Sequence, residues 1–81
     1  MNPGIVSIDL HGRNTYQTKI AVDAALRRAN SGTYRLRLIH GYHGGTQLQT
    51  MIRKVYRRHP RVLRLELGLN PGETELVLRE Y

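Results

Sequence analysis

Residues 5–12 have the sequence IVSIDLHG, in which Val6, Ile8 and Leu10 alternate with polar neighbours. Successive side chains of a strand point to opposite faces of its sheet, so this pattern predicts a strand that ends at Gly12. A strand that is covered on both faces has a continuous apolar run instead. We therefore expect a sheet with one face packed against helices and one face open to water.

Three later segments show the same alternation of apolar and polar residues. The additional predicted strands are residues 34–39, 62–67 and 75–79. Pro71 and Gly72 stand between the last two segments in the positions that a type II turn prefers. The open face of the sheet is predicted to carry Asp9, His11, Arg35, Arg37, Arg64 and Arg79.

Two segments between the strands have helical spacing. Asn14 and Gln17 form a capping-box pattern at the start of the first, which stops near Gly32. Thr46 and Gln49 form a second capping-box pattern. The apolar stripe that follows consists of Leu48, Met51, Ile52 and Val55, and Pro60 limits that helix at its carboxyl end.

The order of the predicted elements is βαβαββ. Strands that alternate with helices favour a parallel first pair, and the short last connection favours an antiparallel hairpin. Right-handed crossovers place both helices on one face of the sheet. We predict an α/β fold of the two-layer type, with a four-stranded mixed sheet, in a single domain of residues 1–81 whose core begins near residue 5.

The charge of the chain is the clearest sign of its partner. Thirteen Lys and Arg residues against six Asp and Glu give a net charge of +7, and eleven of the thirteen are Arg. Residues 1–64 hold twelve of the bases, whereas residues 65–81 hold four of the acids. Such a basic body predicts binding to nucleic acid through release of counterions. The alternative is a small protein that surplus charge keeps in solution.

Several classes of protein are excluded by composition. The chain has no Cys, which excludes disulfides and thiolate metal sites. Its apolar runs are far shorter than the roughly 20 residues of a membrane-spanning helix. The first residues lack the features of a signal peptide. We expect a cytoplasmic protein with no membrane association.

Asp9 and His11 are the first candidates for catalysis. They lie two residues apart at the carboxyl end of a predicted parallel strand, where ligands of α/β sheets bind. A carboxylate beside an imidazole fixes its tautomer and prepares it for general acid–base chemistry. Gly12 allows a tight turn and a close approach of the ligand. The alternative is that Asp9 only fixes the first turn of the loop, with His11 as its hydrogen-bond partner.

The segment HGYHGGT, residues 40–46, follows the adjacent strand and leads into the second helix. Its glycines expose backbone N–H groups at a helix N-terminus, which suits a phosphate. The residues of this predicted site are His40, Gly41, His43, Gly44 and Gly45. A flexible turn is the alternative, and the inward parity of His40 also fits a buried structural histidine. We predict no metal site here, because two histidines lack a third ligand.

Four cations lie on the second predicted helix, on the face opposite its apolar stripe: Arg53, Lys54, Arg57 and Arg58. Cations in the last turn of a helix stabilise it through the helix dipole. That effect accounts for Arg57 and Arg58 but not for all four, whereas binding to phosphates does. Arg35 and Arg37 on the open face of the sheet complete the predicted phosphate-binding surface. A solvated helix face remains the alternative.

These motifs, in this order, resemble the Smr (small MutS-related) domain over residues 5–81. Asp9 to Gly12 match its first motif, and His40-Gly41 match the start of its second. The sequence departs from the family pattern at His43, where a second Gly is usual, and at residues 70–74, which lack a Gly-Gly-x-Gly motif. We interpret the chain as a stand-alone, minimal variant of that domain.

The resemblance implies a βαβαββ fold similar to the C-terminal domain of translation initiation factor three. It also implies nicking or endonuclease activity on DNA or RNA, and some family members act on stalled ribosomes. We expect RNA to be favoured over DNA, with His11 as acid or base, Asp9 orienting it, and His40 or His43 as its partner. Cleavage of DNA would require a divalent metal, Mg²⁺ or Mn²⁺. One rival hypothesis is a non-catalytic module that binds RNA or the ribosome. Another is a protein-interaction module whose acidic C-terminal edge, with Glu73, Glu75 and Glu80, pairs with a basic sheet edge of a partner or of its own copy.

Overall fold

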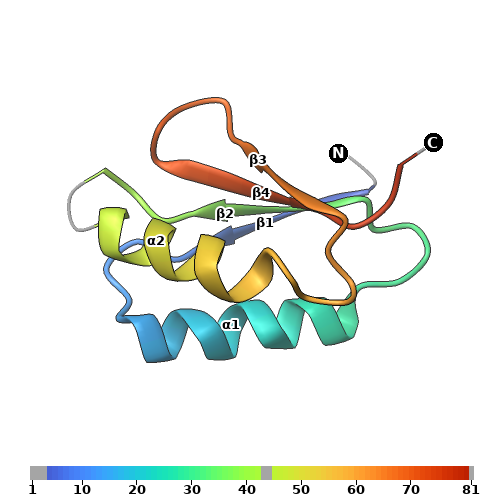
Figure 1. Ribbon diagram of the computed structural model, residues 1–81, viewed down its shortest axis with the longest axis horizontal. Helices are drawn as coiled ribbons and strands as arrows, with labels where there is room; N and C mark the ends of the chain where they lie inside the picture. Colours follow the sequence, from blue (N-terminus) through green and yellow to red (C-terminus); the bar gives the residue numbers. More distant parts are fainter. Residues whose placement is uncertain (1–3, 43–44, 81) are drawn as a thin grey trace.

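The computed structural model describes residues 4–42 and 45–80 and confirms the predicted βαβαββ order (Figure 1). The elements are β1 (Ile5–Asp9), α1 (Thr15–Arg28), β2 (Arg35–Ile39), α2 (Gly45–Tyr56), β3 (Arg64–Leu67) and β4 (Glu73–Val77). Both helices lie against the same face of the sheet, so the opposite face is open (Figure 1). The predicted two-layer α/β architecture is therefore present.

The sheet has the strand order β1-β2-β4-β3, in which β1 and β2 are parallel and the other two pairs are antiparallel. The last strand thus inserts between β2 and β3, which leaves β1 and β3 at the two edges. Asp9 is paired with Ile39, and Ile39 with Glu73, so one row crosses the sheet where β1 and β2 end. This row marks the end of the sheet at which the candidate catalytic loops meet.

The start of α1 agrees with the predicted capping box. The Asn14 side chain accepts a hydrogen bond from the Gln17 amide at 2.7 Å, and the Gln17 side chain accepts one from the Asn14 amide at 3.0 Å. These contacts satisfy two backbone donors that a helix start otherwise leaves free, and such a cap is worth about 1 kcal/mol. They also fix where the chain turns after the Asp9–His11 loop.

Three local expectations were wrong. Helix α2 begins at Gly45, so Thr46 lies within the helix and is not its cap. The same helix ends at Tyr56, so Arg57 and Arg58 follow it rather than belong to its last turn. The Glu73 amide donates to the Asn70 carbonyl across the β3–β4 turn, but Gly72 lacks the positive φ of a type II turn.

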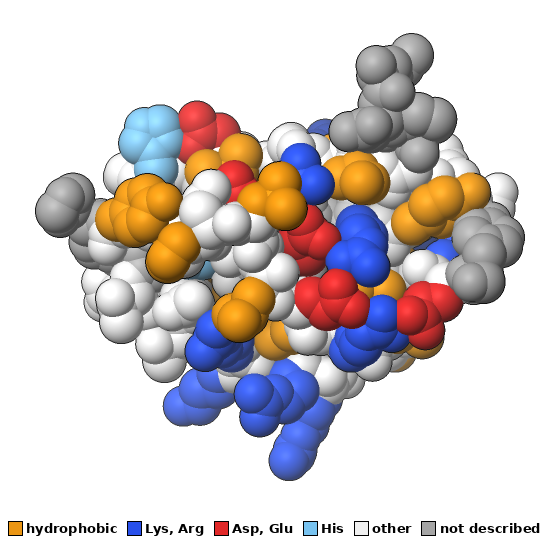
Figure 2. Space-filling view, turned by 90° about the horizontal axis from the view of Figure 1, so that it is seen from above, with side chains coloured by type: hydrophobic (Ala, Val, Ile, Leu, Met, Phe, Trp, Pro, Cys, Tyr) orange, Lys and Arg blue, Asp and Glu red, His pale blue; other side chains and the backbone are white. Residues whose placement is uncertain are grey.

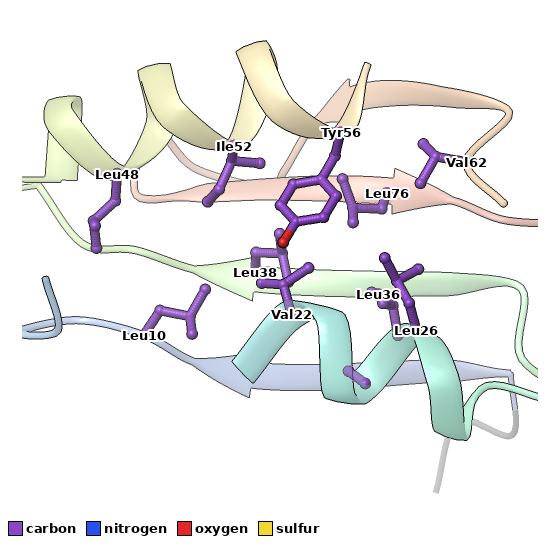
Figure 3. Packing of buried hydrophobic residues seen from close by; sticks show 11 residues of the cluster. Leu10, Val22, Leu26, Leu36, Leu38, Leu48, Ile52, Tyr56, Val62 and Leu76 are labelled. Atoms are coloured by element: carbon purple, nitrogen blue, oxygen red, sulfur yellow. The ribbon is translucent and has the colours of Figure 1, made fainter. Parts of the chain in front are cut away.

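The core lies between the sheet and the two helices (Figure 3). It is formed by Leu10, Leu36, Leu38 and Leu76 from the sheet side, Val22, Ala25 and Leu26 from α1, Leu48, Ile52 and Tyr56 from α2, and Val62. Full burial of one such aliphatic side chain stabilises the fold by about 1.5–3 kcal/mol. Leu10 directly follows β1 and is fully buried, and this anchors the loop that carries His11.

The helices cover the two edge strands, β1 and β3, less completely than the alternation of apolar residues suggested. Val6 on β1 is 44% exposed, and Leu67 on β3 is 75% exposed, although both have the parity of core residues. The helices pack chiefly against the central strands, where Leu36, Leu38 and Leu76 are buried. Within residues 4–42 and 45–80, no helix has the length and apolar character needed to cross a membrane.

Candidate active site

Three loops meet at the carboxyl ends of β1 and β2, on the left of Figure 1. The Leu10 amide donates to the Ile39 carbonyl at 2.8 Å and joins the first loop to β2. The His40 and Gly41 amides both donate to the Gly72 carbonyl, at 2.9 and 3.0 Å, which joins the second loop to the turn before β4. These backbone bonds hold candidate residues from distant parts of the sequence at one end of the sheet.

Asp9 and His11 form a pair on this end of the sheet. Burial of Leu10 between them leaves both side chains in solvent, and the His11 side chain is 70% exposed. The His11 ring donates from Nδ1 to Asp9 Oδ1, and the His11 amide donates to the same oxygen at 3.2 Å. No described residue hydrogen-bonds to His11 Nε2, so the neutral imidazole presents the lone pair of that atom to solvent.

The carboxyl of Asp9 is stabilised in its charged form. The hydrogen bond from the His11 side chain lowers the pKa of Asp9 below its ordinary value, with further contributions from the His11 amide and from the charge of Arg13. The carboxylate is therefore ionised at neutral pH and can orient an imidazole and stabilise its protonated form. The pairing of the two side chains is suited to general acid–base chemistry, and the bond from the His11 amide also fits the alternative in which Asp9 fixes the first turn of the loop.

Gly12 and Gly41 allow the two loops to turn next to each other. Their φ angles are +79° and +85°, in the region that side chains other than Gly rarely adopt. A Cβ atom on Gly41 would lie 3.3 Å from the Cβ of His11, whereas one on Gly12 would meet nothing within 4 Å. Gly12 is thus needed for its conformation, and Gly41 also for the close approach of its loop to His11.

His40 is only 2% exposed and does not face the solvent beside His11. Its Nδ1 donates to the Gly41 carbonyl at 3.1 Å, and its Nε2 accepts from the Thr74 hydroxyl at 3.0 Å. Both ring nitrogens are therefore engaged inside the protein. This position matches the structural alternative for His40, in which the ring holds the second loop against β4.

The remaining residues of the second loop are only partly described. His43 and Gly44 lie outside the described residues, so the predicted phosphate cradle is represented by Gly41 and by Gly45, the first residue of α2. The amino end of α2, which carries a partial positive charge, follows the same loop. In the part of the chain that the structure describes, no three His, Asp or Glu residues are grouped to hold a metal ion.

The structure adds two residues that sequence reasoning missed. Tyr42 follows Gly41 and is 63% exposed, so it presents an aromatic ring on the second candidate loop. Glu73 lies in the cross-strand row of Asp9, with one oxygen buried 4.0 Å from the Arg37 Nε and the other accepting from the Asn70 amide group. The position of Tyr42 in a Gly-rich loop was visible in the sequence, but the row that contains Glu73 depends on the β2–β4 pairing.

The sheet arginines have acidic partners on the open face, where Figure 2 shows blue and red side chains in contact. Arg35 donates to Glu66 at 2.6 Å and to Glu75 at 2.7 Å, and Arg37 donates to Glu75 at 3.1 Å. Arg64 pairs with Glu66 in the same network. The charges of Arg35 and Arg37, which were predicted to bind phosphate, are thus compensated by carboxylates from β3 and β4. Neither arginine is hydrogen-bonded to the loop of His11 or to the described part of the loop that follows β2.

The cations at the carboxyl end of α2 and directly after it have the opposite environment. Together with Thr50 they line a shallow depression of about 670 Å³, and its charged members are Arg53, Lys54, Arg57 and Arg58. None of the four forms an ion pair with a residue that the structure describes. Figure 2 shows basic side chains that project from one edge of the molecule. Arg53 and Arg57 also line a second depression with Glu66, but neither forms an ion pair with it. We call these four residues the α2 cluster.

Comparison with known proteins agrees with this geometry. The family model of the Smr domain matches residues 8–72, a range that includes the Asp9–His11 loop and reaches the turn before β4. The fold is similar to the crystal structure of the Smr domain of Thermus thermophilus MutS2, with a TM-score of 0.81 and 32% sequence identity. The similarity covers 93% of this chain and 99% of that one. No match was found among curated protein sequences. The chain belongs to the Smr domain family, a family of nucleic-acid-binding and nuclease-type modules.

Proposed function

We propose that this protein is an endonuclease that binds single-stranded RNA and cleaves it with His11 as general base. The observation that carries the proposal is the Asp9–His11 pair, in which Nδ1 donates to the carboxylate and Nε2 faces solvent. RNA contains its own nucleophile, the 2′-hydroxyl group, so an imidazole that accepts its proton is sufficient to start the reaction. The absence of a side chain on Gly41 lets the second loop approach His11 closely.

The reaction is balanced with two proton transfers. His11 Nε2 takes the proton of the 2′-hydroxyl, whose oxygen attacks the phosphorus, and the bond to the 5′-oxygen breaks. The products are a 2′,3′-cyclic phosphate and a 5′-hydroxyl group, which receives its proton from a general acid. Asp9 stabilises the imidazolium that forms on His11. His43 is the proposed acid, because both ring nitrogens of His40 are engaged by Gly41 and Thr74.

The developing negative charge on the phosphate requires donors that are already in place. We assign this role to the backbone N–H groups of Gly45, the first residue of α2, and of Gly44, which precedes it in the sequence. DNA lacks the internal nucleophile, so its cleavage would depend on added Mg²⁺ or Mn²⁺. Cleavage of RNA should therefore continue without Mg²⁺ or Mn²⁺, whereas cleavage of DNA should require one of them.

Binding of the rest of the strand is proposed to depend on the α2 cluster. Its four cations lack acidic partners among the described residues, so they are free to replace counterions on phosphates. Ribosomal RNA in the cytoplasm offers the same chemistry, which makes the ribosome a second proposed partner. The α2 cluster is also compatible with the rival function, a non-catalytic RNA-binding module, because binding through these cations needs no catalytic residue.

The decisive experiment is a cleavage assay on labelled single-stranded RNA and on DNA of the same sequence, each with EDTA and with added Mg²⁺ or Mn²⁺. We expect RNA cleavage in EDTA, and a loss of about 10²–10⁴-fold for His11→Ala. His59→Ala is the matched control, since His59 lies after α2, and its ring accepts from the Arg61 amide. Cleavage that survives in His11→Ala would contradict the assignment, and a pure protein that cleaves neither strand would establish the binding module.

Binding is tested separately from cleavage. The affinity for RNA should fall with salt, with a slope of about 0.7 in log K per neutralised phosphate on a single strand. Arg53→Glu combined with Arg57→Glu should weaken binding without unfolding the protein, whereas His11→Ala should bind almost normally. An affinity that does not change with salt would exclude nucleic acid as the partner.

A further inference from the structure

A groove runs along the outer edge of β1, between this strand and α1. It has a volume of about 420 Å³, within the range of small-molecule sites. On the side of α1 the apolar part of the groove is lined by two small residues, Ala25 within the helix and Ala29, which directly follows it. Val6 and Ile8 of β1 form part of its wall, and the exposure of Val6 is consistent with the small size of the residues opposite it.

The groove is continuous with the Asp9–His11 pair. Asp9 lines it at the end nearest to the catalytic loops, and Ser7 follows along the strand. From Asp9 back to Val6 the strand extends by roughly 10 Å. A strand of RNA held at His11 is therefore next to this groove, and a neighbouring nucleotide reaches it without crossing the sheet.

Two arginines give the groove its charge. Arg13 lies in the loop after β1, and Arg28 is the last residue of α1, and both line the groove. Neither forms an ion pair within residues 4–42 and 45–80, in contrast to the arginines of the open sheet face. The carboxylate of Asp9 also lines the groove, and the charge of Arg13 acts on it. An apolar wall beside two guanidinium groups that form no ion pair is complementary to a nucleotide, whose base has flat apolar faces and whose phosphates are anionic.

We propose that this groove is a nucleotide subsite, which holds the base beside the cleaved bond against Val6, Ala25 and Ala29 and a flanking phosphate against Arg13 and Arg28. This inference rests on the proposed function, since the nucleotide belongs to the strand that His11 cleaves. The subsite also restricts the substrate to unpaired strands, because a base can enter the groove only when it is not paired with another base. Single-stranded RNA is thus the substrate, and a base-paired strand is excluded from the groove.

Arg28 also stabilises α1 through the helix dipole, so the experiment needs a control for this structural effect. Arg27 and Arg28 both lie in the last turn of α1, where each interacts equally well with the helix dipole. Only Arg28 lines the groove, whereas Arg27 faces a different depression between the helices. Arg27→Gln is therefore the matched control for Arg28→Gln. Ala29→Leu is a second kind of variant, which fills the groove and leaves every charge in place.

The experiment is a titration of the full chain with a 2′-O-methyl ribodinucleotide, which cannot be cleaved, followed by NMR of the backbone amides. We expect shifts at residues 6–9 of β1, a Kd that rises about tenfold in Arg13→Gln and in Arg28→Gln, and no change in Arg27→Gln. Ala29→Leu should weaken binding to a similar extent. A dinucleotide that lacks one base should also bind more weakly to the normal chain. Its Kd there should be at least as high as the Kd of the complete dinucleotide for Ala29→Leu.

The outcomes distinguish this proposal from the proposed function. Cleavage that depends on His11 together with amide shifts confined to the α2 cluster would overturn the subsite and leave the nuclease intact. Shifts along β1 in a protein that never cleaves RNA would support the subsite as part of the binding module. Equal losses in Arg27→Gln and Arg28→Gln would overturn it, as would β1 amides that shift with protein concentration alone, because a second copy of the chain would then cover the groove.

Discussion

Two sets of cations in this molecule look alike in the sequence and differ in the fold. Arg35, Arg37 and Arg64 on the sheet donate to carboxylates of Glu66, Glu75 and Glu80. The α2 cluster forms no ion pair with any residue that the structure describes. A sheet arginine thus contributes to stability and little to the external field, whereas an α2 cation contributes to the field and little to stability.

The difference follows from topology. The acids are concentrated in residues 65–81, and the β2–β4–β3 order folds this segment back against the basic strands. Arg37 is paired with Glu75, and Glu75 with Glu66, in one row across the sheet. Helix α2 lies against the other face of the sheet (Figure 1), and although Arg53 and Arg57 line a depression that Glu66 also lines, neither forms an ion pair with it. Net charge in a sequence therefore overstates the charge that is available to a polyanion.

The largest expected effect comes from the same substitution at one position of each set. Arg35→Gln should lower the free energy of unfolding by about 2 kcal/mol, because the carboxylate of Glu75, which is only 6% exposed, loses one of its charged donors. Arg53→Gln should change it by less than about 0.5 kcal/mol. Thermal unfolding followed by circular dichroism measures both.

Binding to RNA should show the reverse order. Arg53→Gln should weaken binding and reduce the salt slope by about 0.7, and Arg35→Gln should leave both unchanged at a temperature where it is folded. If the two variants lose stability or affinity to the same extent, the distinction between paired and free cations is wrong.

The second prediction concerns acid. Hydrogen bonds from Arg35, and then from Arg64, lower the pKa of Glu66 from its ordinary value of 4.5. A carboxyl with a lower pKa in the folded state contributes stability above about pH 4.5, and loses it as the pH falls through the folded-state value. The stability difference between the normal chain and Arg35→Gln should therefore shrink on acidification.

The matched control is again Arg53→Gln. Its small stability difference from the normal chain should stay constant between about pH 7 and pH 3, because no carboxyl of the network depends on Arg53. Unfolding curves at a series of pH values give both differences. A gap for Arg35→Gln that stays constant, or widens, below about pH 4.5 would contradict the assigned role of the network.

The fold and the Asp9–His11 pair could be predicted because both are encoded locally. Alternation at Val6, Ile8 and Leu10 gives the strand and its buried face, and the spacing of Asp9 and His11 places them together. The inward parity of His40 also indicated its burial. These signals need only the periodicity of the strand and no knowledge of distant contacts.

The partners of the sheet arginines could not be predicted in this way. Arg35 is 40 residues from Glu75 and 31 from Glu66, and only the insertion of β4 between β2 and β3 brings them together. The sequence indicated that β3 and β4 form a hairpin but not which of them lies beside β2. The groove along β1 was missed for a related reason, since it depends on which residues of α1 face an edge strand.

The smallest expected effect uses the two lysines of the chain. Lys19 is paired with Asp23 at 2.6 Å, whereas Lys54 in the last turn of α2 has no acidic partner among the described residues. Lys54→Gln should reduce the salt slope of RNA binding by about 0.7. It should also lower stability by less than about 0.5 kcal/mol at low salt through the helix dipole, as for Arg53→Gln, and this loss should disappear near 1 M salt. Lys19→Gln should lower stability to a similar extent without changing the salt slope, because its charge is already compensated. Equal slopes for the two variants would mean that an acidic partner does not decide whether a cation of this protein binds phosphate.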